Sequence, residues 1–108
     1  MTTTHGLIAT KRPTSVNEEE FYTVPSDTEV FGVLTICNQS TFQLVNYSVA
    51  HKSSVGGAGS DEWIRYLKPL SFGDSHRIPM VMRAAEAISI QASIANTVSF
   101  VFAGRVVS

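Results

Sequence analysis

The chain has 108 residues, of which 44% are hydrophobic and 16% are charged, the composition of one globular domain rather than of a disordered segment. Eight basic and nine acidic residues give a net charge of −1, so we expect neither nucleic acid nor an anionic membrane as a partner. The longest apolar runs, such as residues 100–103, are far too short for a membrane-spanning helix, and the first residues do not have the pattern of a signal peptide.

Residues 1–20 differ in composition from the rest of the chain. They are mostly polar, and only Leu7, Ile8 and Val16 offer sizeable apolar side chains. This composition predicts an extended N-terminal arm that contains one short strand around residues 6–10. We therefore divide the chain into an arm at 1–20 and a folded domain at 21–108.

From residue 21 onward, short β-rich runs alternate with turn residues. The runs contain β-branched and aromatic residues and are bounded by Pro, Asp, Asn or Gly, which predicts strands at 21–24, 29–37, 42–50, 62–67, 76–82, 88–94 and 98–107. Residues 52–61, rich in Gly and Ser, are predicted to be an exposed loop. Residues 83–87 favour helix but are too few for a stable one, so we expect a turn or a single helical turn.

Three of these strands carry further information. The run 29–37 is apolar at both odd and even positions, which predicts that both of its faces are covered. Pro79 removes a backbone donor from the run 76–82, which favours an edge strand or a bulge. Residues 88–94 alternate between apolar and polar side chains, the pattern of a half-buried strand.

Seven or eight short strands without a convincing helix predict an all-β fold. We expect a single antiparallel β-sandwich with Greek-key or jelly-roll-like topology. A thin sandwich of this size cannot cover both faces of every strand, so we expect some of the cover to come from another subunit. The predicted protein interface consists of Leu7, Ile8 and Val16 from the arm, together with Phe31 and Val33 from the strand at 29–37.

No pattern of residues indicates catalysis, a metal or a cofactor. His5, His51 and His76 are scattered without metal-ligand spacing, and the lone Cys37 lies in an apolar run, where a free cysteine usually acts as a small buried hydrophobe. The acidic run at 18–20 has no obvious partner, so we expect it to be solvated or to pair between subunits. We predict a non-enzymatic protein without catalytic residues, metal or cofactor, and expect no small-molecule ligand; a small enzyme is the weakest alternative.

Trp63, Arg65 and Tyr66 follow the glycine-rich loop and offer a second kind of site. Large aromatic side chains in strands usually pack inside, which favours a core position for Trp63. The alternative is an exposed platform for a ligand, because aromatic residues next to polar groups bind sugars and anchor interfaces. On that interpretation the protein is a carbohydrate- or host-receptor-binding β-sandwich module.

Several segments together resemble a group of small structural proteins of tailed bacteriophages. They are RPTS at residues 12–15, FYTVP at 21–25, VLTICNQS at 33–40, DEWI at 61–64 and VSFVFAG at 98–104, and the similarity spans roughly residues 6–105. The chain departs from the group at residues 83–87, where an Ala-Gly-Asp-like turn is expected before the following strand.

The resemblance implies a virion subunit of β-sandwich fold in the capsid-decoration, neck or tail layer. Such a protein is made in the host bacterial cytoplasm and acts as part of a particle. Its implied partners are copies of itself and other virion proteins, and the resemblance supplies no catalytic residue.

Overall fold

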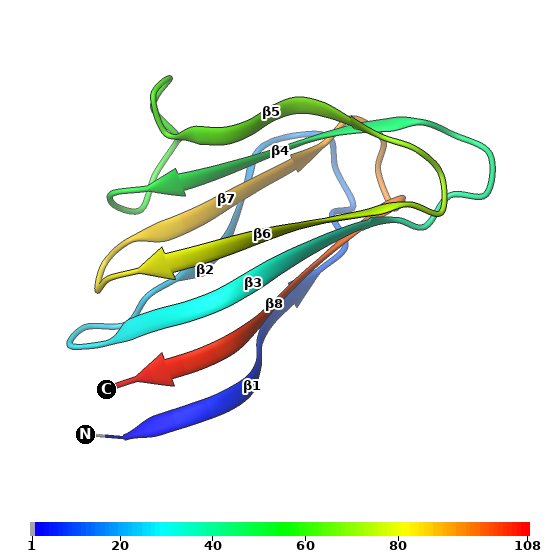
Figure 1. The fold of residues 1–108 in the computed structure, drawn as a ribbon. Coiled ribbons are helices and arrows are strands. Elements are labelled where there is room, and N and C mark those ends of the chain that lie inside the picture. The colour runs from blue at the N-terminus through cyan, green and yellow to red at the C-terminus, as the bar shows by residue number, and fades with distance from the viewer. Residues whose placement is uncertain (1) are drawn as a thin grey trace.

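A computed structural model describes residues 2–108, and within this range all regular structure consists of β-strands (Figure 1). The eight strands in chain order are β1 (Thr3–Lys11), β2 (Glu19–Thr23), β3 (Glu29–Asn38), β4 (Val45–Lys52), β5 (Trp63–Leu70), β6 (Ser75–Met82), β7 (Ala87–Ala92) and β8 (Val98–Val107). They form two antiparallel sheets of four strands each, sheet A in the order β1-β8-β3-β6 and sheet B in the order β2-β7-β4-β5. The predicted all-β sandwich is confirmed at this level.

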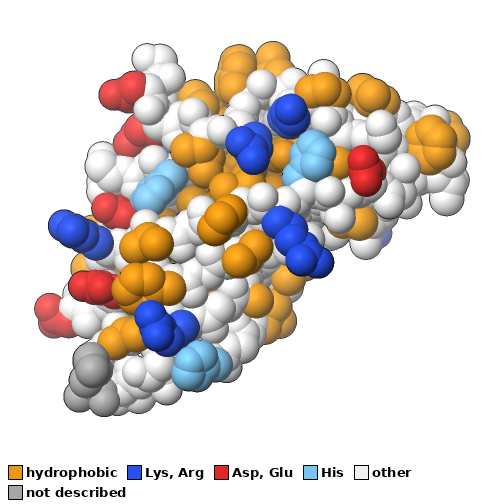
Figure 2. Space-filling model, in the orientation of Figure 1, with side chains coloured by type: hydrophobic (Ala, Val, Ile, Leu, Met, Phe, Trp, Pro, Cys, Tyr) orange, Lys and Arg blue, Asp and Glu red, His pale blue; other side chains and the backbone are white. Residues whose placement is uncertain are grey.

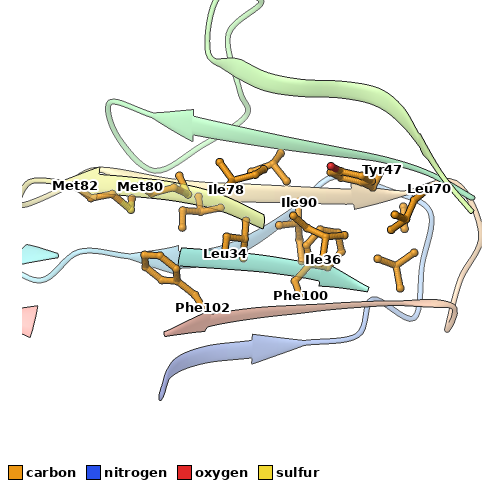
Figure 3. Packing of buried hydrophobic residues seen from close by; sticks show 14 of the residues in the cluster. Leu34, Ile36, Tyr47, Leu70, Ile78, Met80, Met82, Ile90, Phe100 and Phe102 are labelled. Carbon is orange, nitrogen blue, oxygen red and sulfur yellow. The ribbon is translucent and has the colours of Figure 1, made fainter. Parts of the chain in front are cut away.

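The hydrophobic core lies between the two sheets (Figure 3). In β3 and β8 the even-numbered side chains point inward because successive side chains of a strand alternate between its faces. Leu34, Ile36, Phe100 and Phe102 are fully buried in this way, and Tyr47 and Ile90 meet them from sheet B. Burying one such side chain stabilises the fold by about 1.5–3 kcal/mol, so this layer holds the two sheets together.

The chain crosses repeatedly between the sheets. Only β4 and β5 are neighbours both in sequence and within one sheet, where they form a hairpin. Sheet A pairs strands that are all distant in sequence, and its β1 and β8 lie side by side next to the two chain ends (Figure 1). The sandwich is therefore complete only when the two ends of the chain have come together.

Part of the expected N-terminal arm belongs to the sandwich of its own chain. β1 pairs with β8 along its whole length, and the Thr2 N–H donates to the Ser108 carbonyl at 2.7 Å. The proposed boundary after residue 20 falls inside β2, which begins at Glu19. An extended polar segment with β-branched threonines pairs readily with the exposed edge of β8, and this accounts for the difference.

The glycine-rich loop between β4 and β5 is fastened over the outer face of sheet B. Lys52 donates to a carboxylate oxygen of Glu20 at 2.7 Å and to the carbonyl of Gly56, and the Ala58 N–H donates to Glu18 at 3.0 Å. The acidic run at 18–20, expected to be solvated or to pair between subunits, thus has partners within the chain. Ser89 is almost fully buried on this face, so the strand predicted to be half-buried at 88–94 is covered on both sides at Ser89, whereas Gln91 is half-buried and Ser93 is exposed.

Two smaller predictions about the strands are confirmed. β6, which contains Pro79, is an edge strand of sheet A, where the missing N–H does not interrupt a ladder. Residues 83–86 form a turn, in which Ala85 adopts a positive φ of 71°.

Candidate functional site

An uninterrupted row of apolar residues crosses the outer face of sheet A. Leu7 of β1 pairs with Ala103 of β8, Ala103 pairs with Val33 of β3, and Val33 pairs with Pro79 of β6. The four side chains belong to positions that alternate with the core residues of their strands, so they point away from the core. The row therefore runs from one edge of the sheet to the other.

Further apolar side chains widen this row into a patch. Phe31 and Val81 form the adjacent cross-strand pair on one side, and Val101 lies on the other. We define the sheet A patch as Leu7, Phe31, Val33, Pro79, Val81, Val101 and Ala103. Leu7 is 68% exposed, Val33 39% and Val81 64%. Figure 2 shows hydrophobic side chains on this face with Lys and Arg side chains beside them.

The Arg105 guanidinium marks the border of the patch. It lies over the Phe31 ring at 4.7 Å from the ring centre, a cation–π contact that partly covers the aromatic face. The patch thus has an apolar centre with a charged residue at its rim, the arrangement common in protein interfaces.

The structure brings together three of the five predicted interface residues. Leu7, Phe31 and Val33 lie in the sheet A patch, whereas Ile8 and Val16 do not. β1 has an irregularity between Leu7 and Ala9, and Ile8 at this point is partly buried against the core. Val16 lies in the connection to β2, and its carbonyl accepts a hydrogen bond from the Gln91 side chain of sheet B.

Within the single chain, only the inner face of the strand predicted at 29–37 is fully covered, and cover of its outer face by another subunit stays a prediction. The inner face is buried in the core, whereas Val33 on the outer face is 39% exposed. Pro79, Val81, Val101 and Ala103 also belong to the patch but were not predicted from the sequence. The apolar odd positions of β8 were visible in the sequence, but only the register of β3 against β6 and β8 shows that they meet.

Trp63 and Tyr66 form a separate, partly exposed aromatic pair on β5. Their rings meet edge to face with centres 5.5 Å apart, and together with Ser60 they line an open pocket of about 370 Å³. Trp63 is only half-buried and lies outside the core, so the expected core position is wrong.

Arg65 does not join this pair. The pairing of β5 with β4 is irregular, so that Trp63 lies opposite Ala50 of the outer face while Arg65 lies opposite Val49 of the core. The predicted platform of three residues therefore separates into an aromatic pair on one face and an arginine on the other.

The polar residues singled out from the sequence lie apart from one another. The His76 Nδ1 and the Tyr47 hydroxyl are 2.7 Å apart, and the His51 Nε2 lies 2.7 Å from a Glu86 oxygen. Cys37 is half-buried on the outer side of β3, not in the core. Within residues 2–108, no group of three or more His, Cys, Asp or Glu side chains is placed to hold a metal ion, and no helix is long and apolar enough to span a membrane.

Comparison with known proteins gives no assignment. No protein-family model, no curated protein and no solved structure matches this chain.

Proposed function

We propose that the chain is a non-enzymatic structural subunit of a bacteriophage virion, in the capsid-decoration, neck or tail layer, and that it assembles with copies of itself through the sheet A patch. The layer and the particle come from the sequence resemblance, and other virion proteins are further partners on the same ground. The observation that carries the proposal is the apolar row across all four strands of sheet A.

The strand order supports a jelly-roll topology for this subunit. In an eight-stranded jelly roll, one sheet contains the first, eighth, third and sixth strands and the other contains the second, seventh, fourth and fifth, the orders of sheets A and B. Jelly rolls are frequent among viral capsid proteins, in agreement with a role in a particle. Because the same topology also serves lectins, it does not by itself decide the function.

The contrast between the two outer faces supports an interface on sheet A. The chain covers sheet B with its own loop but leaves Leu7 and Val81 more than half exposed on sheet A. Contiguous exposed apolar surface usually marks a binding surface, because its burial stabilises a complex by roughly 25 cal/mol per Å². A second copy brings an identical patch, and two apolar surfaces of the same kind can bury each other.

The experiment compares oligomeric states by native mass spectrometry. We expect the wild-type protein to form a defined oligomer and the double variant Leu7→Glu/Val33→Glu to be a folded monomer. Phe42→Glu is the matched control, because Phe42 is 74% exposed in the loop between β3 and β4. Circular dichroism establishes that each variant is folded. If the wild-type protein is still a monomer at about 100 µM, its self-association is weaker than stable assembly requires. That result would overturn self-assembly through this patch.

The second candidate function is carbohydrate or host-receptor binding at Trp63 and Tyr66. The open pocket beside this edge-to-face pair supports it, because sugars bind on exposed aromatic rings. On this alternative, host polysaccharide changes the fluorescence of Trp63, the only tryptophan, and Tyr66→Ala abolishes the change. Unchanged fluorescence at saturating polysaccharide would exclude it.

A further inference from the structure

A second open pocket lies at the side of the sandwich, between the edge strands β5 and β6. It has a volume of about 450 Å³, and its lining consists of Arg65 and Lys68 from β5 with Ser75, His76 and Arg77 from β6. The two strands belong to different sheets, so the pocket forms only when the sandwich closes.

The positive charge in this pocket has no counterpart among the described acidic residues. Lys11 and Lys52 each form an ion pair with a glutamate, whereas Arg65, Lys68 and Arg77 form none within residues 2–108. No acidic side chain lines the pocket. Three cations that share a pocket repel one another, and a bound anion would relieve that repulsion.

Arg65 supplies a donor that the fold leaves without an acceptor. Its Nε is buried and has no hydrogen-bond partner. The Arg65 side chain lies opposite the core residue Val49 and near Tyr47. Burial raises the pKa of the Tyr47 hydroxyl, and the nearby guanidinium partly offsets this rise. A buried donor without a partner is costly, because it has lost its water and gained nothing in exchange. Arg65 also lines the pocket, so an oxygen ligand bound there would lie beside this guanidinium.

His76 adds a second donor whose orientation is fixed by the core. Its Nδ1 lies 2.7 Å from the hydroxyl of Tyr47, which is buried and packs against Phe100. When the Tyr47 hydroxyl donates this hydrogen bond, the hydrogen of the neutral imidazole is on Nε2. His76 then presents an N–H group and Ser75 a hydroxyl, both suited to bind anionic oxygens.

We propose that this pocket binds a compact oxyanion, the phosphate, sulfate or carboxylate group of a small molecule or sugar. Guanidinium groups bind such anions through two parallel hydrogen bonds, and the lysine and histidine add charge and donors. The pocket falls within the usual size range of small-molecule sites. Such a site differs from the expectation that the protein has no small-molecule ligand, and anion binding there does not depend on the proposed assembly.

The experiment measures anion binding by isothermal titration calorimetry at neutral pH, with ionic strength held constant by sodium chloride. The probes are inorganic phosphate, glucose 6-phosphate and glucuronate, with glucose as the neutral control. We expect saturable binding of at least one charged probe and none of glucose. Binding of phosphate alone identifies a free anion as the ligand, and tighter binding of either acidic sugar identifies a sugar-borne group. Absence of saturable binding by all three charged probes overturns the proposal.

Two exposed positions give variants that should keep the fold. Arg77→Gln and Lys68→Gln remove one charge each from the pocket, and we expect each to weaken binding about tenfold, the effect of losing one charge-assisted hydrogen bond. Arg83→Gln, just beyond the other end of β6, is the control with the same change in charge and should bind within about twofold of the wild type. Equal weakening in all three variants would mean that only the overall charge matters. Retained binding in Leu7→Glu/Val33→Glu would separate this site from the assembly surface.

Discussion

At the scale of single residues, the most constrained charge is Lys52. Its side chain is 1% exposed, whereas that of its partner Glu20 is 37% exposed, and their charged atoms are 2.7 Å apart. The two members of the pair therefore depend on it unequally. Without Lys52 the glutamate can still reach water, but without Glu20 a buried ammonium group has lost its counter-charge.

We therefore expect Glu20→Ala to destabilise the protein more than Lys52→Met. The first change should lower the free energy of unfolding by about 2–3 kcal/mol, because it leaves a charge buried and unpaired. The second should cost about 1 kcal/mol, because methionine fills most of the volume of the lysine stem. Urea denaturation of both variants measures the two values. The opposite ranking would show that Lys52 stabilises the fold mainly by fastening the loop at Gly56.

Two carboxylates make stability depend on acid pH. Burial tends to raise the pKa of Glu86, but the hydrogen bond from the Arg83 N–H and the nearby His51 outweigh it, and the pKa lies below its ordinary value of 4.5. Hydrogen bonds from the Gly59 and Ser53 N–H groups lower the pKa of Glu62 in the same way. In both cases folding favours the ionised form.

Stability should accordingly fall when the pH drops below about 4.5, the pKa of these groups in the unfolded chain. Above that pH both carboxylates are ionised in the folded and unfolded states, and their stabilisation is fully present. As the pH falls towards the lower folded-state pKa values, the unfolded chain takes up protons first and the stabilisation is lost. Urea denaturation between pH 7 and pH 3 should show a shallower fall for Glu62→Gln/Glu86→Gln than for the wild type. Identical slopes would contradict this assignment.

At the scale of strands, the pairing of β3 with β8 depends on two glycines that face each other. Gly32 lies opposite Gly104 in the register of the two strands. A Cβ built on Gly104 would lie 2.2 Å from the Phe31 carbonyl oxygen and 2.5 Å from the Cα of Gly32. Both contacts are with backbone, which cannot move aside as a flexible side chain could. The strands approach too closely here for any other residue.

Gly104→Ala should therefore destabilise the fold by at least about 2 kcal/mol, because β8 must shift away from β3. Gly57→Ala in the β4–β5 loop is the control, since a Cβ there has no atom within 4 Å. It should change stability by no more than about 0.5 kcal/mol. Thermal unfolding followed by circular dichroism compares the two. Equal melting temperatures for both variants would show that the strands can separate at little cost.

The strands could largely be predicted from the sequence, whereas their partners could not. Alternating or β-branched runs bounded by turn residues indicated every strand, and Pro79 indicated an edge. The strand expected at 42–50 begins at Val45, three residues later than predicted, and Phe42 and Leu44 are exposed in the loop before it. The β4–β5 loop is fastened by long-range hydrogen bonds that Glu18 and Glu20 accept from Ala58 and Lys52, and no local pattern encodes such contacts.

The candidate sites show the same division between local pattern and long-range pairing. Leu7, Phe31 and Val33 could be predicted as interface residues from the sequence, because each is apolar in a segment that has more apolar positions than one core-facing side of a strand needs. Ile8 has the same character as Leu7, but the irregularity in β1 turns it towards the core. Arg65 and Trp63 were expected to share a surface, and the irregular pairing of β5 separates them. The basic pocket could not be found from sequence, because it joins two strands of different sheets.

At the scale of the whole molecule, the two outer faces of the sandwich are not equivalent. Sheet B is covered by a loop held by Glu18 and Lys52, whereas sheet A presents the sheet A patch to its surroundings. An exposed patch of this kind on a lone domain favours association. The proposed assembly therefore places sheet A between subunits and leaves sheet B, with Trp63 and Tyr66 at its edge, free for other contacts.

The chemistry of the sheet A patch determines how such an assembly responds to salt. Its members are apolar, while the surrounding charges, such as Arg105, are exposed and worth only about 0–1 kcal/mol in any ion pair. About 1 M sodium chloride screens exposed charges beyond roughly 3 Å but leaves apolar burial intact. We therefore expect the oligomer to persist at that concentration, with an unchanged mass by light scattering. Arg105→Gln should likewise leave it assembled, whereas Val33→Glu should weaken it. Dissociation of the wild-type oligomer in salt would mean that ion pairs at the rim, and not the apolar row through Leu7 and Val33, hold the subunits together.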